Sequence, residues 1–155
     1  QLMKRMEIKG CEFAYVTLHS GLGNFRPIEV EDLTKHKMDS EEMHVNQENA
    51  NIINKAVERG SKICCVGTTT MKAMETSTTI TKKIVPFDGW SNKFIFPPYD
   101  FGVSNCMVTN FHPPLSSMLM ISAAFGGYDL IMDAYKQAVA EKYKFLTYGD
   151  AMLII

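Results

Sequence analysis

The segment "TNFHPPLSSMLMISAAFGG", residues 109–127, places a histidine at the mouth of an otherwise apolar helix. Two consecutive prolines exclude helix before Ser116 and hold the preceding backbone extended. Residues 110–112 therefore lie beyond the carboxyl end of a predicted strand, where open α/β sheets bind ligands. Because imidazole exchanges protons near neutral pH, His112 is a candidate acid or base. A histidine packed under the loop, with its hydrogen bonds satisfied, is the structural alternative.

A second candidate is the turn in "CCVGTTTMKAMET", residues 64–76. Gly67 lets the backbone turn after a strand, and three threonines precede a helix. Backbone N–H groups and the positive end of the helix then converge on one point, which would stabilise a carboxylate or a phosphate. An ordinary strand–helix turn with a threonine N-cap is the alternative. The turn is not a P-loop, because no Gly-Lys-Ser/Thr follows the glycine at the required spacing.

The segment "YVTLHSGLGNFRP", residues 15–27, combines a histidine, two glycines and an arginine. Gly21 and Gly23 permit close approach of the backbone to a ligand. His19 ends a predicted strand, where an imidazole can transfer protons or serve a purely structural role. No third glycine opens a helix, which excludes the dinucleotide-binding fingerprint.

Two further polar segments complete the candidates. "KHKMDSEEMH", residues 35–44, mixes histidines and carboxylates without a diagnostic metal-ligand spacing, so we predict a solvated loop and no metal site. "TYGDAM" brings Tyr148 and Asp150 to the entry of the last predicted strand, where an acid could partner a histidine.

The composition is that of one globular domain. With 155 residues the chain can bury a core, and 46% hydrophobic and 21% charged residues are ordinary for a globular protein. A net charge of −1 means that a nucleic-acid partner would need a local basic patch. The candidates are "KHK" at 35–37 and "TKK" at 81–83, although short charge clusters usually form solvated surface.

The cysteines indicate the cellular compartment, and the first residues indicate whether the chain is part of a longer protein. None of the four cysteines forms a CxxC pair, and each lies in an apolar stretch, which indicates a reduced, cytoplasmic protein. Adjacent Cys64 and Cys65 point to opposite faces of a strand. The sequence shows no signal peptide and no apolar run near the roughly 20 residues of a membrane span. It begins inside a helical pattern without an initiator methionine, so we expect a piece of a longer protein.

The elements that must position these residues alternate between helix and strand, which predicts one layered α/β domain over residues 1–155. Helices are predicted at 2–10, 46–60, 71–78, 116–125 and 129–145, with Asn46 and either Ser116 or Ser117 as N-caps. Strands are predicted at 11–19, 28–33, 62–66, 94–96, 106–110 and within 148–155. Residues 34–45 carry no assignable pattern.

Taken together, the motifs resemble the S-adenosylmethionine:tRNA ribosyltransferase-isomerases of queuosine biosynthesis. The matching segments follow the family order from residue 15 to residue 154: "YVTLHSGLGNFRPIEV", "HKMDSE", "VGTTTMKAMET", "TNFHPPLSSMLMISAAFGGY" and "YKFLTYGDAMLI". The resemblance implies the C-terminal part of a longer enzyme. It also implies an αβα sandwich around a mostly parallel or mixed sheet, completed by an N-terminal portion with a β-barrel-like domain.

The sequence departs from the family pattern at a few positions. Lys72 stands where an arginine is usual, and this loses bidentate recognition of a carboxylate or phosphate. The other departures, each of which concerns local geometry, are Pro113 for leucine, Pro98 for glycine, Leu115 for a charged residue and Asp39 for histidine.

The resemblance implies a reaction. The ribosyl moiety of S-adenosylmethionine is transferred to 7-aminomethyl-7-deazaguanine at the tRNA wobble position and isomerised to epoxyqueuosine, with release of adenine and methionine. S-adenosylmethionine is then a consumed substrate, so no separate cofactor and no metal are implied. The implied partner is tRNA, no membrane is involved, and nothing in the sequence indicates an oligomeric state.

This chemistry assigns hypothetical roles to the candidates. Proton transfer next to the sulfonium and to departing adenine needs an acid and a base, for which His112 and His19 are candidates, with Asp150 or Glu41 as orienting carboxylates. Base flipping needs aromatic stacking, for which the candidates are Phe25, Phe111 and Tyr148. The remaining substrate-binding candidates are Gly21, Gly23, Gly67, Thr68, Thr69, Thr70, Lys72 and Asn110. The candidate contacts to tRNA phosphates are Arg26, Lys35 and Lys37.

Two other functions remain open at this stage. The chain could be a non-catalytic α/β domain that binds a small anionic or adenosyl ligand. A nucleotide-binding hydrolase is the other, and the lack of a P-loop and of a nucleophile elbow argues against it. The true length of the reading frame discriminates an enzyme fragment from an isolated binding domain.

Overall fold

The computed structural model describes residues 1–155, except for the side chain of Tyr148. Its first sheet is antiparallel, in the order β1–β2–β4, and consists of β1 (Thr17–Leu18), β2 (Glu41–Val45) and β4 (Phe87–Ser91). In β2 the side chains alternate between buried and exposed, as expected for a strand with one face on the core. Glu41 occupies the first of the buried positions.

The second sheet is mixed, in the order β3–β5–β6. Strands β3 (Cys64–Val66) and β5 (Cys106–Asn110) run parallel, whereas β6 (Ala151–Ile154) pairs antiparallel with β5. The predicted α/β class with a mixed sheet is confirmed, and the antiparallel sheet is an addition that the sequence did not indicate.

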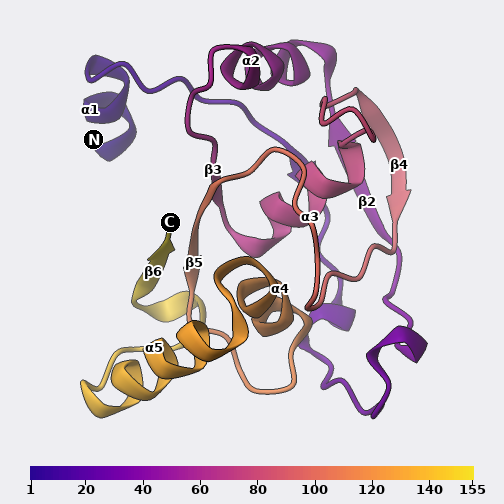
Figure 1. Cartoon of the computed structure of the whole chain (residues 1–155), viewed down its shortest axis with the longest axis vertical. Helices are drawn as coiled ribbons and strands as arrows, with labels where there is room; N and C mark the ends of the chain where they lie inside the picture. Colours follow the sequence, from indigo (N-terminus) through magenta and orange to yellow (C-terminus); the bar gives the residue numbers. More distant parts are fainter.

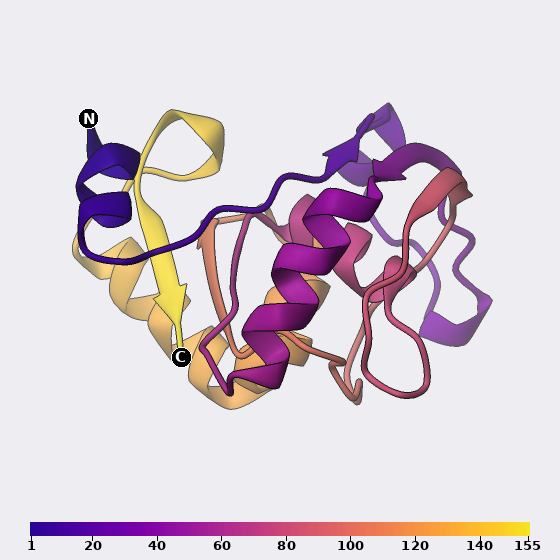
Figure 2. The same cartoon turned by 90° about the horizontal axis from the view of Figure 1, so that it is seen from above.

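Helix α3 lies between the two sheets and packs against strands of both (Figure 1). The α-helices are α1 (Leu2–Ile8), α2 (Gln47–Glu58), α3 (Thr68–Ser77), α4 (Ser117–Gly126) and α5 (Tyr128–Ala140). Short 3₁₀ turns are η1 (Leu22–Phe25), η2 (Leu33–Lys35) and η3 (Leu146–Tyr148). Helix α2 covers the assembly on the side opposite to α4 and α5 (Figures 1 and 2). None of the helices in the described part of the chain is long and apolar enough to cross a membrane.

The core forms where α3 meets the sheets. Met43 of β2, Met71 of α3 and Met107 of β5 are fully buried there. Because α3 is enclosed on several sides, residues 71–75 are buried consecutively, and this run includes the charged side chains of Lys72 and Glu75. Burial of charge is costly unless each group finds partners.

The predicted helices and their caps agree well with the structure. Gly10, with φ of +89°, follows the C-cap of α1, and the N–H of Cys11 reaches back to the carbonyl of Met6. Asn46 caps α2 through its side-chain oxygen, and Ser116, one of the two predicted candidates, caps α4. There are two exceptions. Helix α3 begins at Thr68, three residues before its predicted start. The last helix was predicted to reach residue 145, but α5 ends at Ala140.

Several predicted strands are wrong. Residues 28–33 contain no strand, and the predicted strand 11–19 shrinks to β1. Residues 94–96 are coil, in which Phe94 contacts the rings of His36 and Phe96. The sheet instead uses β4, whose Asp88 and Gly89 have poor strand propensity, because β2 supplies all of its ladder partners.

The mixed sheet has one open face. Cys65 is buried, whereas its neighbours Cys64 and Val66 are exposed, so the predicted opposite orientation of the two cysteines is confirmed. Leu153 of β6 lies on the same open face, because it pairs with Val108, which in turn pairs with Val66. Burial raises the pKa of the Cys64 thiol to about 12, with a further contribution from Cys106, and that of Cys65 to about 11.

The cap of α2 provides a test of the fold. Replacing Asn46 with alanine removes the acceptor for the Asn49 N–H, 2.8 Å away, and we expect the free energy of unfolding to fall by about 1 kcal/mol. Chemical denaturation of the full-length gene product measures it. Asn51→Ala, at an exposed position within the same helix, is the matched control. It removes only the exposed hydrogen bond from Gln47 and should change the free energy of unfolding by less than about 0.5 kcal/mol. Equal destabilisation by both variants would contradict the assignment.

Candidate functional site

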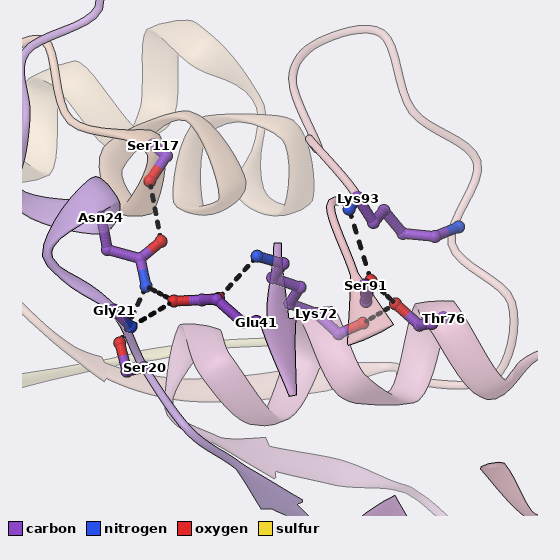
Figure 3. A network of polar contacts seen from close by, with 9 residues as sticks. All are labelled: Ser20, Gly21, Asn24, Glu41, Lys72, Thr76, Ser91, Lys93 and Ser117. Carbon is purple, nitrogen blue, oxygen red and sulfur yellow. Dashed lines mark hydrogen bonds and ion pairs between the residues drawn. The ribbon is translucent and has the colours of Figure 1, made fainter. Parts of the chain in front are cut away.

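A buried ion pair joins β2 to α3. The ammonium of Lys72 lies 2.6 Å from Oε2 of Glu41, and the two side chains are 3% and 2% exposed (Figure 3). Both residues were sequence candidates, Glu41 as an orienting carboxylate and Lys72 as a substrate contact. The structure brings them together and commits the Lys72 ammonium to a carboxylate of its own chain.

The other oxygen of the same carboxylate holds the glycine-rich turn. Oε1 of Glu41 accepts hydrogen bonds from the Asn24 side chain at 2.6 Å and from the Gly21 backbone N–H at 2.7 Å (Figure 3). Asn24 also donates to Ser20 and accepts from the Ser117 hydroxyl at 3.4 Å. We call Glu41, Lys72, Asn24 and the Gly21 N–H the Glu41 network.

The two glycines of this turn serve contacts within the chain. Gly21 donates to Glu41, and a Cβ atom added to Gly23 would lie 2.5 Å from Oδ2 of Asp39. The two glycines were predicted to let the backbone approach a ligand. In this structure they let the backbone approach side chains of the same chain, Glu41 and Asp39. Asn24 and Ser117 were missed, and no signal in a single sequence distinguishes them from other polar loop residues.

The mouth of α3 keeps the features predicted for anion binding. Gly67, with φ of +97°, is the N-cap and makes no side-chain cap, so the threonine N-cap alternative is wrong. Thr68 is buried, and the Thr70 hydroxyl turns back to the carbonyl of Val66. The first-turn N–H groups of a helix have no partner within that helix, and they leave a positive end toward which an anion can be oriented.

His112 is buried and satisfied by its own chain. Its Nε2 lies 2.7 Å from the Thr109 hydroxyl, and its backbone N–H donates to the Tyr135 hydroxyl at 2.8 Å. Burial lowers the pKa of His112 to about 4, so the ring is neutral at neutral pH. A neutral imidazole can accept a proton, but it cannot supply one as an imidazolium.

The neighbours of His112 differ from expectation. Phe111 was predicted to stack on a base, but it is 4% exposed and packs against the rings of Tyr135, Tyr143 and Phe145, so it is a core residue here. The aromatic cluster explains why a histidine next to it is desolvated.

Asp150 was predicted to partner a histidine. Its carboxylate accepts instead from the backbone N–H of Lys144 at 2.7 Å, and its carbonyl accepts from the Asn110 side chain at 3.1 Å. His112 and Asp150 therefore make their described hydrogen bonds to different groups. The predicted stacking residue Tyr148 lies outside the described side chains.

Two of the three candidate tRNA contacts line a hollow beside the glycine-rich turn. This hollow of about 280 Å³ is lined by Arg26 and Lys37, among others. Arg26 pairs with Asp39 at 3.6 Å, and Lys35 pairs with Asp32 at 3.6 Å; all four side chains are largely exposed. Phe25, which precedes Arg26 in the sequence, is 63% exposed.

His19 directly follows β1 and is exposed. Its backbone N–H donates to the carbonyl of Glu42 at 2.8 Å. The segment of residues 35–44 was predicted to be a solvated loop, but its last four residues belong to β2. Within the described residues, no group of three or more histidine, cysteine or acidic side chains could hold a metal ion.

A second buried carboxylate lies on α3. Glu75 accepts from the Gly102 N–H at 3.0 Å and from the Tyr99 hydroxyl at 3.1 Å, and Lys93 in turn donates to Tyr99. Burial raises the pKa of Glu75, although these hydrogen bonds oppose the shift. Glu75 fixes the loop after β4, and none of the sequence candidates takes part in these contacts.

The buried pair predicts an asymmetric response to lysine removal. Lys72→Met leaves the Glu41 carboxylate buried beside the remaining amide donors without its cation, and we expect a loss of about 3–5 kcal/mol in the free energy of unfolding. Lys136→Met removes an exposed partner of Asp133 and serves as the matched control, with no measurable change expected. Urea denaturation measures the free energy of unfolding of both variants. A Lys72 variant as stable as the control would contradict the buried pairing.

His112 predicts a pH dependence. Its folded pKa of about 4 lies below its ordinary value, so the unfolded state takes up the proton first as the pH falls. We expect this residue to lower the free energy of unfolding by about 2 kcal/mol between pH 7 and pH 5. His112→Gln should remove that part of the pH dependence in denaturation curves, whereas His19→Gln, at an exposed position, should retain it. Parallel profiles for wild type and His112→Gln would refute the burial of an uncharged ring.

Comparison with known proteins connects this geometry to a family. Residues 1–154 match the model of a family described as queuosine biosynthesis protein. The S-adenosylmethionine:tRNA ribosyltransferase-isomerase of Phocaeicola vulgatus is 63% identical over 155 residues, which are 100% of this chain and 44% of that protein. The protein of the same name from Symbiobacterium thermophilum is 46% identical over 155 residues, which are 100% of this chain and 46% of that protein.

A solved structure agrees with these matches. The crystal structure of S-adenosylmethionine tRNA ribosyltransferase from Thermotoga maritima is similar with a TM-score of 0.81 and 36% sequence identity, over 99% of this chain and 48% of that chain. The chain thus spans about half the length of the relatives it matches. Sequence and fold agree along nearly the whole of its length, and the chain belongs to the queuosine biosynthesis protein family.

Proposed function

We propose that the protein containing this chain transfers the ribosyl moiety of S-adenosylmethionine to 7-aminomethyl-7-deazaguanine in the tRNA wobble position and isomerises it to epoxyqueuosine. Adenine and methionine are the released products, S-adenosylmethionine is consumed, and no further cofactor takes part. The observation that carries the proposal is the 63% identity, over the full chain, to a protein named for this activity. Because the proposed substrate is a tRNA, we also propose that the protein acts in the cytoplasm.

The geometry supports parts of this assignment. The mouth of α3, with Gly67 and the threonines at 68–70, provides oriented N–H groups for the methionine carboxylate. Lys72 lies one turn further along α3 and supports this region through Glu41 instead of binding the anion itself. Arg26, Lys35 and Lys37 remain the proposed contacts to tRNA phosphates, and Phe25 is the exposed candidate for stacking on a base.

Proton transfer is assigned by protonation state. His112, neutral at physiological pH, suits the role of base at the carbon next to the sulfonium better than that of acid. His19 is exposed and remains the candidate acid for the departing adenine. Glu41 is fully engaged with Lys72, Asn24 and Gly21, so we assign it a supporting role. The alternative of a non-catalytic ligand-binding domain is not favoured by the names of the relatives.

The test is an activity measurement on the full-length gene product. We expect adenine release from S-adenosylmethionine only with tRNA that carries 7-aminomethyl-7-deazaguanine, and not with the same tRNA carrying guanine. Release of adenine independent of the modified base, or no release at all, would overturn the proposal.

The role of His112 is tested in the same assay. His112→Ala should lower kcat by about 10²–10⁴-fold, the usual contribution of a general acid or base. His44→Ala, at an exposed position of β2, is the matched control and should leave turnover unchanged. A thermal unfolding curve for each variant shows that the fold is retained. Turnover by a folded His112 variant at the wild-type rate would remove the residue from the mechanism.

A further inference from the structure

We propose that Asn24 is a positioning residue for tRNA binding. It ties the turn of residues 20–26 to the buried Glu41–Lys72 pair and so holds Phe25 and Arg26 where an RNA can contact them. This inference rests on the proposed function only in naming tRNA as the ligand. The tie itself is a property of the chain.

The amide of Asn24 connects three parts of the fold. Its nitrogen donates to Oε1 of Glu41 at 2.6 Å and to the Ser20 hydroxyl at 2.8 Å, and its oxygen accepts from Ser117 on the first turn of α4 at 3.4 Å (Figure 3). Within η1, Asn24 is the buried residue, with 5% exposure. This side chain therefore anchors the turn to the core, together with the backbone N–H of Gly21.

The residues that follow Asn24 point outward. Phe25 is 63% exposed, and the Arg26 side chain is 70% exposed beside the hollow. An exposed aromatic ring and a guanidinium are the groups that stack on a base and pair with a phosphate. Arg26 pairs at the surface with the exposed Asp39 at 3.6 Å, and the placement of both side chains depends on the backbone that Asn24 helps to hold.

The anchor is strong because its acceptor is charged. A hydrogen bond to a charged group contributes more than one between neutral groups, and the acceptor here is the Glu41 carboxylate that pairs with the Lys72 ammonium at 2.6 Å. When the amide is removed, the turn retains the Gly21 N–H bond to Glu41 and the packing of Gly23 against Asp39. The fold should survive, whereas the local opening of the turn should become more frequent.

The experiment compares Asn24→Ala with Asn92→Ala, which removes an exposed amide elsewhere, in the full-length gene product. Hydrogen–deuterium exchange should be about tenfold or more faster in residues 20–26 of the Asn24 variant and unchanged in α2. In the adenine-release assay, KM for modified tRNA should rise about tenfold, while kcat and KM for S-adenosylmethionine stay within about twofold. The Asn92 variant should match wild type in all of these measurements.

The outcomes separate the two proposals. Unchanged exchange in residues 20–26, or a loss confined to kcat, would overturn the positioning role while leaving the proposed function intact. An inactive wild-type enzyme would overturn the proposed function, and the exchange measurement would still decide whether Asn24 holds the turn. If Asn24→Ala also loses protection in α2, the variant has disturbed the fold beyond the turn, and Ser117→Ala is measured in its place. Ser117→Ala removes only the 3.4 Å hydrogen bond to Asn24. It must then speed exchange in residues 20–26, by less than the loss of the whole amide would.

Discussion

The buried ion pair between Glu41 and Lys72 is the constraint on which the candidate site depends. Two charges withdrawn from water cost several kcal/mol each, and this cost is offset only if both find well-placed partners. The Glu41 carboxylate has three such donors: the Lys72 ammonium, the Asn24 amide and the Gly21 N–H. A different register of β2, or a different rotation of α3, would leave a charge buried without a partner. The pair therefore specifies one arrangement more than it adds stability.

Helix α3 transmits this constraint to both sheets. It packs against β1 and β2 on one side and against β3 and β5 on the other, and it begins at the glycine turn after β3. Its second buried carboxylate, Glu75, fixes the loop that follows β4 through Gly102 and Tyr99. A helix with polar groups inside the core is thus positioned by directional bonds as well as by its apolar surface.

Local patterns predicted the elements that depend on local interactions. The caps at Asn46 and Ser116 and the strand β5 follow from side chains adjacent in the sequence. Strands β2 and β4 were not predicted. β4 contains Asp88 and Gly89, and it is a strand because β2, more than forty positions earlier, pairs with it along its length. For the site, residue type indicated Glu41, Lys72 and His112, but not which of them meet.

The site itself shows the same division. That a histidine follows β5 could be read from the sequence, but its neutral state depends on Phe111, Tyr135 and the other rings that exclude water around it. Asn24 could not be identified, because its importance lies entirely in three partners at distances of 4, 17 and 93 residues along the chain.

The open face of the mixed sheet has a consequence for the redox chemistry of the chain. Cys64 is accessible to solvent, yet its pKa of about 12 leaves almost no thiolate at neutral pH, and the same holds for Cys65 behind it. Since the thiolate is the species that attacks peroxides, disulfides and alkylating reagents, accessibility does not make this thiol reactive. Desolvation, with a contribution from Cys106 at Cys64, thereby lowers the thiolate fraction of two adjacent cysteines and with it their expected reactivity toward oxidants.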